Sequence, residues 1–226
     1  FIDERGQTYL AGHDSWDRVT SRAMPEGNRT FFSYDQASNI TQLIKCDKTN
    51  AVADCTSGSR LVATATYDAA FNKPTSITDF RGSTTNLSYI ASGPGRGELQ
   101  QVLRPAPGSG ALSTVRPQYD YTYNSVGQLL TTVAKIDSTT NVSTTNAYDA
   151  SGSLVSTTVD SGGLALKTCY AYNAVGDRTG IWDPRNTSCT GSNYKTTISY
   201  SVVRRPITVT DALGHQRTTA YDLNGR

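Results

Sequence analysis

The chain has 226 residues, 36% of them hydrophobic and 18% charged, and its 21 Lys and Arg against 19 Asp and Glu give a net charge of +2. The basic residues are scattered among the acids, which argues against a nucleic-acid partner, and no stretch approaches the roughly 18 apolar residues that span a bilayer. Thr, Ser, Gly, Asn and Tyr are abundant, a composition typical of strands and tight turns.

One short phrase recurs along the chain. It consists of an aromatic residue, then Asp or Asn, two variable residues and often Gly, as in YDASGS (148–153), YNAVGD (172–177) and YDLNGR (221–226). A unit of about 21 residues with insertions explains its spacing, so we expect a single repeat array over residues 1–226 without a domain boundary. The aromatic anchors are His13, Tyr34, Tyr67, Tyr89, Tyr123, Tyr148, Tyr172, Tyr200 and Tyr221.

A second turn divides each unit into halves of roughly ten residues. Asp with Gly three residues later stands ten residues before an anchor at Asp3, Asp79 and Asp211, and Met24 holds the same place before Tyr34. Apolar and polar residues alternate between the turns, which is typical of strands. Each unit is therefore predicted to be a β-hairpin, and the chain an all-β array of roughly 16 short antiparallel strands.

Glycine closes most of these turns, because it adopts positive φ without steric cost. Four anchors are followed at that place by Asp17, Ser38, Phe71 or Arg204. We expect those turns to close differently, with Asp17 and Ser38 bonding their own backbone. The turn glycines are Gly6, Gly27, Gly82, Gly93, Gly127, Gly152, Gly176, Gly214 and Gly225.

Three insertions, near 46–60, 91–116 and 186–193, lengthen the intervals between anchors. None interrupts an anchor, so each is predicted to be an extended hairpin loop. Added loop length costs little, because closure entropy grows only logarithmically.

Four cysteines form two local pairs, Cys46 with Cys55 in the first insertion and Cys169 with Cys189 around one unit. The Cys-x-x-Cys spacing of zinc sites is absent. We favour the disulfides Cys46–Cys55 and Cys169–Cys189 among the three possible connectivities, with free buried thiols as the alternative. Disulfides would imply an oxidising compartment.

The repeat resembles the YD repeat of the rearrangement-hotspot (Rhs) family. The phrase at 221–226 matches Y-D-x-x-G-R fully, the phrases at 123–128, 148–153 and 172–177 match in part, and the frame covers essentially the whole chain. In that family, which includes toxin-complex shells and teneurins, such repeats spiral into a hollow β-shell around a C-terminal toxic domain or form an extracellular barrel. The resemblance implies a curved, spiralling sheet in an internal segment of a longer protein, acting as a container. The family's shell-terminating core, which in some members carries autoproteolytic aspartates, has no counterpart in this sequence.

The recurring Tyr and Asp have two interpretations each. A row of Tyr rings could form an exposed track for sugars or bases, but one ring at a fixed place in every unit favours a ladder that pins strand register. The Asp residues are not clustered as in calcium loops, so we interpret them as turn formers and expect no metal or cofactor.

No catalytic constellation is visible in the sequence. His13 stands at an anchor and His215 follows a glycine turn, and Glu4, Glu26 and Glu98 are isolated. Nucleophilic catalysis needs a nucleophile beside a base, and glycoside hydrolysis needs two facing carboxylates. We therefore expect no enzymatic activity.

These features predict a structural segment of a secreted or cell-surface bacterial YD-repeat protein, forming the wall of a β-shell that encapsulates or presents a C-terminal toxin. Its partners would be the rest of its own polypeptide and an enclosed toxin domain. Two alternatives remain: an extracellular filament assembled through open strand edges, and an adhesion module that binds glycans through the inserted loops.

Overall fold

The structure is a computed structural model, and it describes residues 2–49, 55–56, 58–108, 115–137 and 139–222. The described residues form 17 β-strands and no helix, so the all-β prediction is confirmed with one strand more than the rough count of 16. Accordingly, this part of the chain offers no helix able to cross a membrane.

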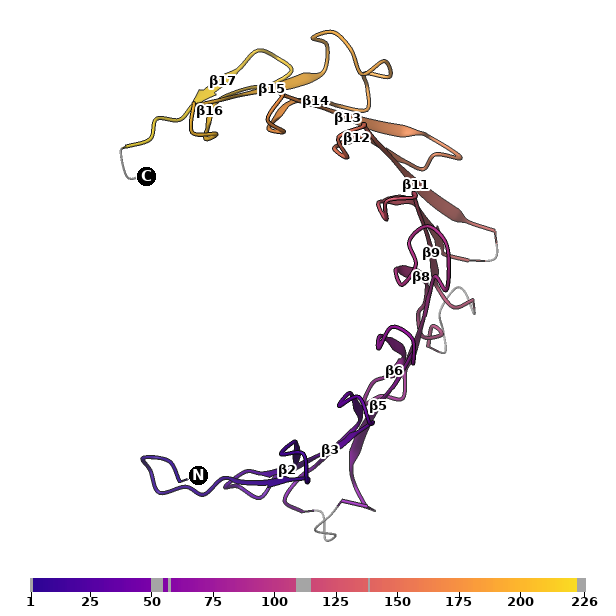
Figure 1. Cartoon of the computed structure of the whole chain (residues 1–226), viewed down its shortest axis with the longest axis vertical. Coiled ribbons are helices and arrows are strands. Elements are labelled where there is room, and N and C mark those ends of the chain that lie inside the picture. Colours follow the sequence, from indigo (N-terminus) through magenta and orange to yellow (C-terminus); the bar gives the residue numbers. More distant parts are fainter. Residues whose placement is uncertain (1, 50–54, 57, 109–114, 138, 223–226) are drawn as a thin grey trace. The chain divides into compact units, whose positions relative to one another are not determined.

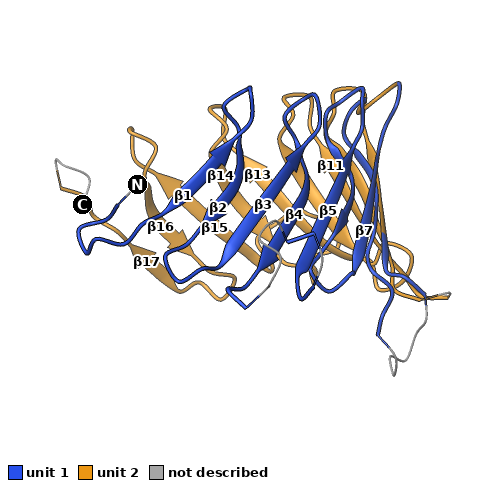
Figure 2. Ribbon diagram, turned by 90° about the horizontal axis from the view of Figure 1, so that it is seen from below, with its two compact units in different colours: residues 1–92, 96–118 blue, residues 93–95, 119–226 orange. Residues whose placement is uncertain are grey.

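The chain divides into two compact units, residues 1–92 with 96–118 and residues 93–95 with 119–226 (Figure 2). The first unit contains β1 (Leu10–His13), β2 (Val19–Ala23), β3 (Arg29–Tyr34), β4 (Ile40–Cys46), β5 (Leu61–Tyr67), β6 (Pro74–Thr78), β7 (Thr84–Tyr89) and β8 (Leu99–Leu103). The second contains β9 (Gln118–Tyr123, from Tyr119 onward), β10 (Leu129–Lys135), β11 (Asn141–Tyr148), β12 (Leu154–Val159), β13 (Leu166–Tyr172), β14 (Arg178–Trp182), β15 (Lys195–Tyr200), β16 (Pro206–Thr210) and β17 (Gln216–Thr218).

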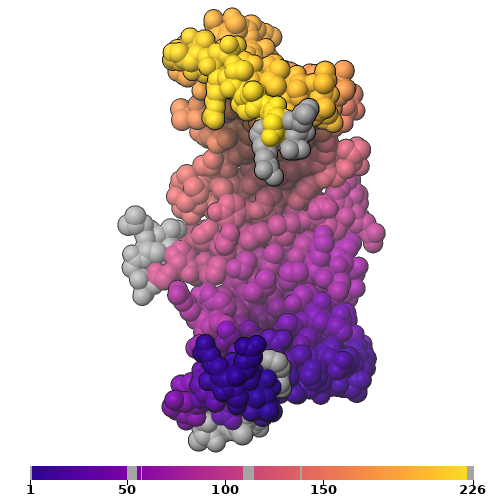
Figure 3. Space-filling model, turned by 90° about the vertical axis from the view of Figure 1, so that its left-hand side faces the viewer, coloured from indigo at the N-terminus to yellow at the C-terminus, as the bar shows by residue number. Residues whose placement is uncertain are grey.

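Within each unit the strands pair antiparallel in chain order, from β1 to β8 and from β10 to β17. Figure 3 shows the same order within each unit as bands of gradually changing colour. Most contacts are therefore between chain neighbours, as expected for a hairpin repeat.

A β-bulge recurs beside the anchors. The register shifts at Ser33/Tyr34, Thr66/Tyr67 and Ser88/Tyr89 in the first unit and at Ala147/Tyr148 and Ala171/Tyr172 in the second. A bulge adds one residue to one strand of a pair and bends it. Bulges repeated at one edge account for the bend of the sheet that Figure 1 shows within each unit.

The described residues of neither unit form a conventional hydrophobic core. Among the described residues, the buried hydrophobic side chains are Cys46, Cys55, Cys169 and Trp182. Each unit is a single layer, so both faces of its strands stay accessible, and stability depends on neighbouring strands rather than on a second layer.

The register places matching residues in rows across the strands. In the first unit, one row across the strands runs Ser33, Gln42, Thr64, Thr78 and Thr84. The adjacent row, on the opposite face, begins Phe32, Leu43 and Ala63. The face of Ser33 also carries the row Phe31, Ile44 and Val62, so polar and apolar rows share each face.

The three inserted segments lie at different places relative to the strands. Residues 46–60 connect β4 to β5, although residues 50–54 and 57 lie outside the described residues, and residues 186–193 lie between β14 and β15. The range 91–116 is not a single loop, because β8 lies within it and divides it. The sequence LQQVL of β8 alternates only weakly, which hid this strand.

Candidate functional site

The hydroxyl groups of the anchor tyrosines donate hydrogen bonds to the backbone of the neighbouring strand. Tyr34 ends β3, and its hydroxyl donates to the carbonyl oxygen of Val19, the first residue of β2, at 2.8 Å. Because β2 and β3 are antiparallel, the end of one lies beside the start of the other. We call each such bond a tyrosine clamp.

The clamp recurs in both units with the same geometry. The acceptor is always the first residue of the preceding strand. The other clamps join Tyr67 to Ile40, Tyr89 to Pro74, Tyr148 to Leu129, Tyr172 to Leu154, Tyr200 to Arg178 and Tyr221 to Pro206. The predicted ladder is thus made of hydroxyl-to-backbone bonds, and the exposed His13 has no such bond among the described residues.

The turn is a five-residue Asx turn after five of the anchors, namely His13, Tyr34, Tyr123, Tyr148 and Tyr172. In the turn 149–153, Asp149 Oδ1 accepts hydrogen bonds from the backbone N–H groups of Ser151 and Ser153, and the Gly152 N–H donates to the Asp149 carbonyl. Gly152 has a φ of 85°, which L-residues rarely adopt. The Asn124 and Asn173 side chains accept the equivalent bonds in their turns.

The expectation that turns without glycine close differently was wrong for three of the four. Asp17, Ser38 and Arg204 adopt positive φ, 61°, 67° and 61°, and close the same turn. The side chains that bond the backbone belong to the first turn residues, Asp14 and Asp35, not to Asp17 and Ser38. The Phe71 turn does differ: it is one residue longer, and Asn72 takes the positive φ.

Glycine takes the positive-φ place in the remaining turns. The predicted glycines with positive φ are Gly6, Gly27, Gly82, Gly93, Gly127, Gly152, Gly176 and Gly214, while Gly225 lies outside the described residues.

These bonds lower the pKa of the turn carboxyls. The Ser151 hydroxyl and the backbone N–H groups of its turn lower the pKa of Asp149 from 3.8. The Asn39 side chain does the same to the pKa of Asp35. The N–H groups of Thr139 and Thr140 lower the pKa of Asp137 to about 2. All of these carboxylates are ionised at neutral pH.

The residue that ends an Asx turn also contacts the next turn along the same edge. Arg18 donates from Nε to Asp14 Oδ2 at 2.7 Å and from a terminal nitrogen to the Asp35 carbonyl at 2.9 Å. Lys73 Nζ donates to the Gly97 carbonyl, and Gln128 Nε2 to the Gly152 carbonyl. We call these contacts turn bridges. They tie the hairpins together at the edge, outside the strand pairing.

Sequence analysis missed the turn bridges. Their signal was the long polar residue directly after the turn glycine, such as the Arg of Y-D-x-x-G-R, which we had treated only as part of the phrase. The strands themselves supply no clue, because the partner of each bridge lies in a different repeat.

Both disulfides join the cysteines that we had paired. The Cα atoms are 6.3 Å apart in Cys46–Cys55 and 5.7 Å apart in Cys169–Cys189, within the usual range. Cys55 and Cys169 are fully buried in this thin sheet. Each bond fixes an insertion against its neighbouring strand.

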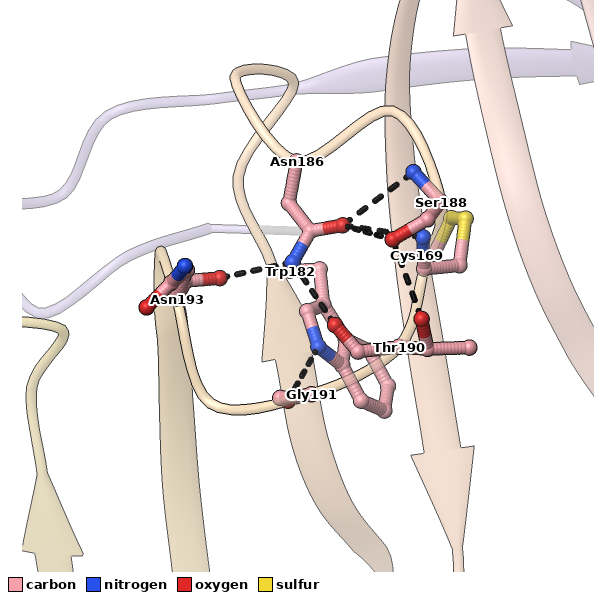
Figure 4. Close-up of a disulfide and its surroundings, with 8 residues drawn as sticks. Cys169, Trp182, Asn186, Ser188, Thr190, Gly191 and Asn193 are labelled. Atoms are coloured by element: carbon pink, nitrogen blue, oxygen red, sulfur yellow. Dashed lines mark hydrogen bonds between the residues drawn. A yellow bond between two sulfur atoms is a disulfide. The ribbon is translucent and has the colours of Figure 1, made fainter.

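The loop between β14 and β15 is organised around one buried Asn (Figure 4). Asn186 Nδ2 donates to the carbonyl oxygens of Thr190 and Asn193, and its Oδ1 accepts from the N–H groups of Ser188 and Cys189. The indole N–H of Trp182 donates to the Gly191 carbonyl at 3.0 Å. The disulfide, the Asn and the Trp together hold this loop over β13 and β14.

The structure brings no catalytic groups together in the described part of the chain. It contains no group of three or more His, Cys, Asp or Glu that could hold a metal ion. His215 Nδ1 lies 2.9 Å from Asp211 Oδ2 within an exposed turn, while His13 lies at an exposed strand end. Glu26 Oε1 accepts a hydrogen bond from Asn28 Nδ2 at 3.5 Å within a turn.

Comparison with known proteins supports the fold. No protein-family model matches the chain, and no curated protein matches its sequence significantly. Three similar solved structures are of toxin-complex proteins: TcdB2-TccC3 without its hypervariable C-terminal region (TM-score 0.63, 19% identity), TcdB2-TccC3-TEV (0.66, 14%) and TcdB2-TccC3 (0.63, 18%). They cover 96% of this chain each, whereas the chain spans 12%, 11% and 12% of theirs.

At these identities the similarity shows the fold alone. The chain shares the all-β hairpin sheet of the TcdB2-TccC3 shell, so the predicted resemblance to YD-repeat toxin-complex shells is confirmed at the level of the fold.

Proposed function

We propose that the chain is a structural wall segment of a secreted or cell-surface bacterial YD-repeat protein, part of a β-shell that encapsulates or presents a C-terminal toxin. The observation that carries the proposal is the similarity of almost the whole chain to a small part of the TcdB2-TccC3 structures. A chain that matches a large toxin-complex protein in this way is expected to act together with the rest of its own polypeptide.

The local structure suits a wall. Neighbouring hairpins are joined by strand pairing and tyrosine clamps, and in several places by turn bridges, without a second layer. Such a sheet can enclose volume without a core of its own. Two disulfides favour maturation in an oxidising compartment, which agrees with secretion. In this role the chain performs no catalysis.

The test is electron cryo-microscopy of the full-length parent protein under non-reducing conditions, combined with limited proteolysis. We expect closed hollow particles with this segment in the wall, and a C-terminal region that resists protease until the shell is opened by denaturant. Continuous fibres with a repeat of one chain would contradict the container and favour edge-to-edge assembly. A C-terminal region cleaved as fast in the intact particle as in the opened one would also contradict it.

A further inference from the structure

One pair of neighbouring turns in the second unit has no turn bridge. The turn 124–128 is bridged to 149–153 by Gln128, and the turn 173–177 to 201–205 by the ion pair of Asp177 with Arg204. Between 149–153 and 173–177 the bridging place is held by Ser153, whose side chain is too short. No hydrogen bond between these two turns is found in the described part of the chain.

An open hollow of about 460 Å³ lies at this gap. Its lining includes Asp149, Ser151 and Ser153 from one turn, and Tyr172 and Asn173 from the next strand end. Asp149 Oδ1 is occupied by the turn N–H groups and the Ser151 hydroxyl, whereas Oδ2 accepts no hydrogen bond from the described residues. The hollow therefore presents an ionised carboxylate oxygen beside a Tyr ring.

In other repeats a basic side chain occupies the position that corresponds to this hollow. At the turn 14–18, the Arg18 guanidinium binds Asp14 Oδ2, donates to the Asp35 carbonyl and lies over the Tyr34 ring, with 4.6 Å from Cζ to the ring centroid. Lys73 lies over Tyr89 at 5.5 Å, and Arg205 over Tyr221 at 5.4 Å. In three repeats a cation stands over the next anchor ring, whereas the residue in that place of the repeat before Tyr172 is Ser153.

The three groups that hold Arg18 have counterparts around the hollow. Asp149 corresponds to Asp14, the Asn173 carbonyl to that of Asp35, and Tyr172 to Tyr34, by their places in the repeat. A carboxylate oxygen, a carbonyl oxygen and an aromatic face together form a guanidinium site. The guanidinium of Arg178 on β14 lies over the ring of Tyr170, which lines the hollow, but Arg178 itself does not line it.

We propose that the hollow between the turns 149–153 and 173–177 binds a guanidinium group supplied from outside the chain, in the place that Arg18 fills in its own repeat. The group can come from an exposed arginine of another protein segment or from a free small molecule. The site is independent of the proposed container function.

The test is an NMR titration of the disulfide-bonded chain with methylguanidinium, and in parallel with the peptide Gly-Gly-Arg-Gly-Gly. We expect saturable shifts of the amides of Ser151, Ser153 and Asn173, and none with uncharged methylurea. A peptide that binds more than about tenfold tighter than methylguanidinium identifies a protein as the source, and equal affinities identify a small molecule.

Three variants locate the site. Asp149→Asn keeps the Asx turn, since Asn124 and Asn173 form it elsewhere, and should weaken binding about tenfold by removing the charge. Ser153→Arg should abolish binding by placing an internal guanidinium in the hollow. Ser83→Arg is the matched control, because Ser83 ends the Asx turn that begins at Asp79 and lies outside the hollow, and it should bind like the wild type.

Three outcomes would overturn the proposal. The first is a linear, non-saturable response to methylguanidinium. The second is wild-type affinity in Asp149→Asn. The third is equal loss of binding in Ser153→Arg and Ser83→Arg, which would show that only the net charge matters.

Discussion

The hydroxyl of Tyr172 donates a hydrogen bond to the backbone carbonyl of Leu154, 18 residues earlier in the chain and 2.9 Å away. It joins the end of β13 to the start of β12. A one-residue slip of β13 would move this ring to the other face of the sheet, so the bond is compatible with a single register.

Removing this hydroxyl should destabilise the second unit. Tyr172→Phe leaves the ring but deprives the Leu154 carbonyl of its donor, and we expect a loss of about 1 kcal/mol in the free energy of unfolding. Urea denaturation followed by circular dichroism measures it. Tyr170→Phe, in the same strand, is the control, because no partner of the Tyr170 hydroxyl is found in the described residues. Equal losses in both variants would contradict a role for the clamp.

The positive-φ place of the Asx turn should respond oppositely to two substitutions. Asp17 has a φ of 61°, so Asp17→Gly relieves backbone strain and should stabilise the chain by about 1 kcal/mol. Gly176 has a φ of 84° at the same place of its own turn, so Gly176→Ala should cost about 1 kcal/mol. Thermal unfolding of both variants tests the pair, and changes of the same sign would refute the shared turn geometry.

Asn186 should be critical for the loop between β14 and β15. It is 7% exposed and its side chain takes part in hydrogen bonds with four other residues, so Asn186→Ala leaves buried backbone groups without partners. We expect a loss of about 3 kcal/mol. Hydrogen exchange should become faster across 183–194, whereas Asn193→Ala, which keeps its backbone carbonyl, should leave exchange unchanged. Unchanged exchange in Asn186→Ala would show that the disulfide alone orders the loop.

Stability should fall only in strong acid. Asp35, Asp149 and Asp137 have pKa values lowered from 3.8 in the folded state, so their contribution is complete above the unfolded-state pKa and is lost as the pH falls through the folded-state pKa. We expect urea midpoints that are constant from about pH 7 to 5 and decrease from about pH 4 down to 2. Asp137 should contribute at the acid end, since its pKa is about 2. Asp137→Asn should make the decrease shallower. A midpoint that drops above pH 5 would point to other groups.

Much of the fold could be predicted because it is local. The alternation of apolar and polar residues gave the strands, and the spacing of the anchors gave the hairpins, since each contact joins neighbouring segments. The Cys pairs were predictable for the same reason, because each pair spans a single loop. Strand β8 was missed where the alternation is weak and the surrounding Gly and Pro favour a loop.

The geometry of the turns without glycine could not be predicted from the sequence, because several residue types can occupy the positive-φ position of the same turn. Asp17, Ser38 and Arg204 adopt a glycine-like φ because Asp14, Asp35 and Ser201 at the start of each turn hold it closed. The positive-φ residue alone therefore did not reveal the turn. The proposed guanidinium site at Ser153 could not be predicted from the sequence either, because it is recognised only by comparison with the contacts that Arg18 makes in another repeat.

The clamp has a consequence for how such chains change length. Each clamped tyrosine bonds to the hairpin just before it, and each turn bridge connects adjacent turns, so these contacts join only direct neighbours in the chain. Deleting or duplicating one unit, from one anchor to the next, rejoins the same donors to equivalent acceptors. Genetic recombination between copies of the repeat would thus lengthen or shorten the protein in whole units and keep the clamps and the strand pairing.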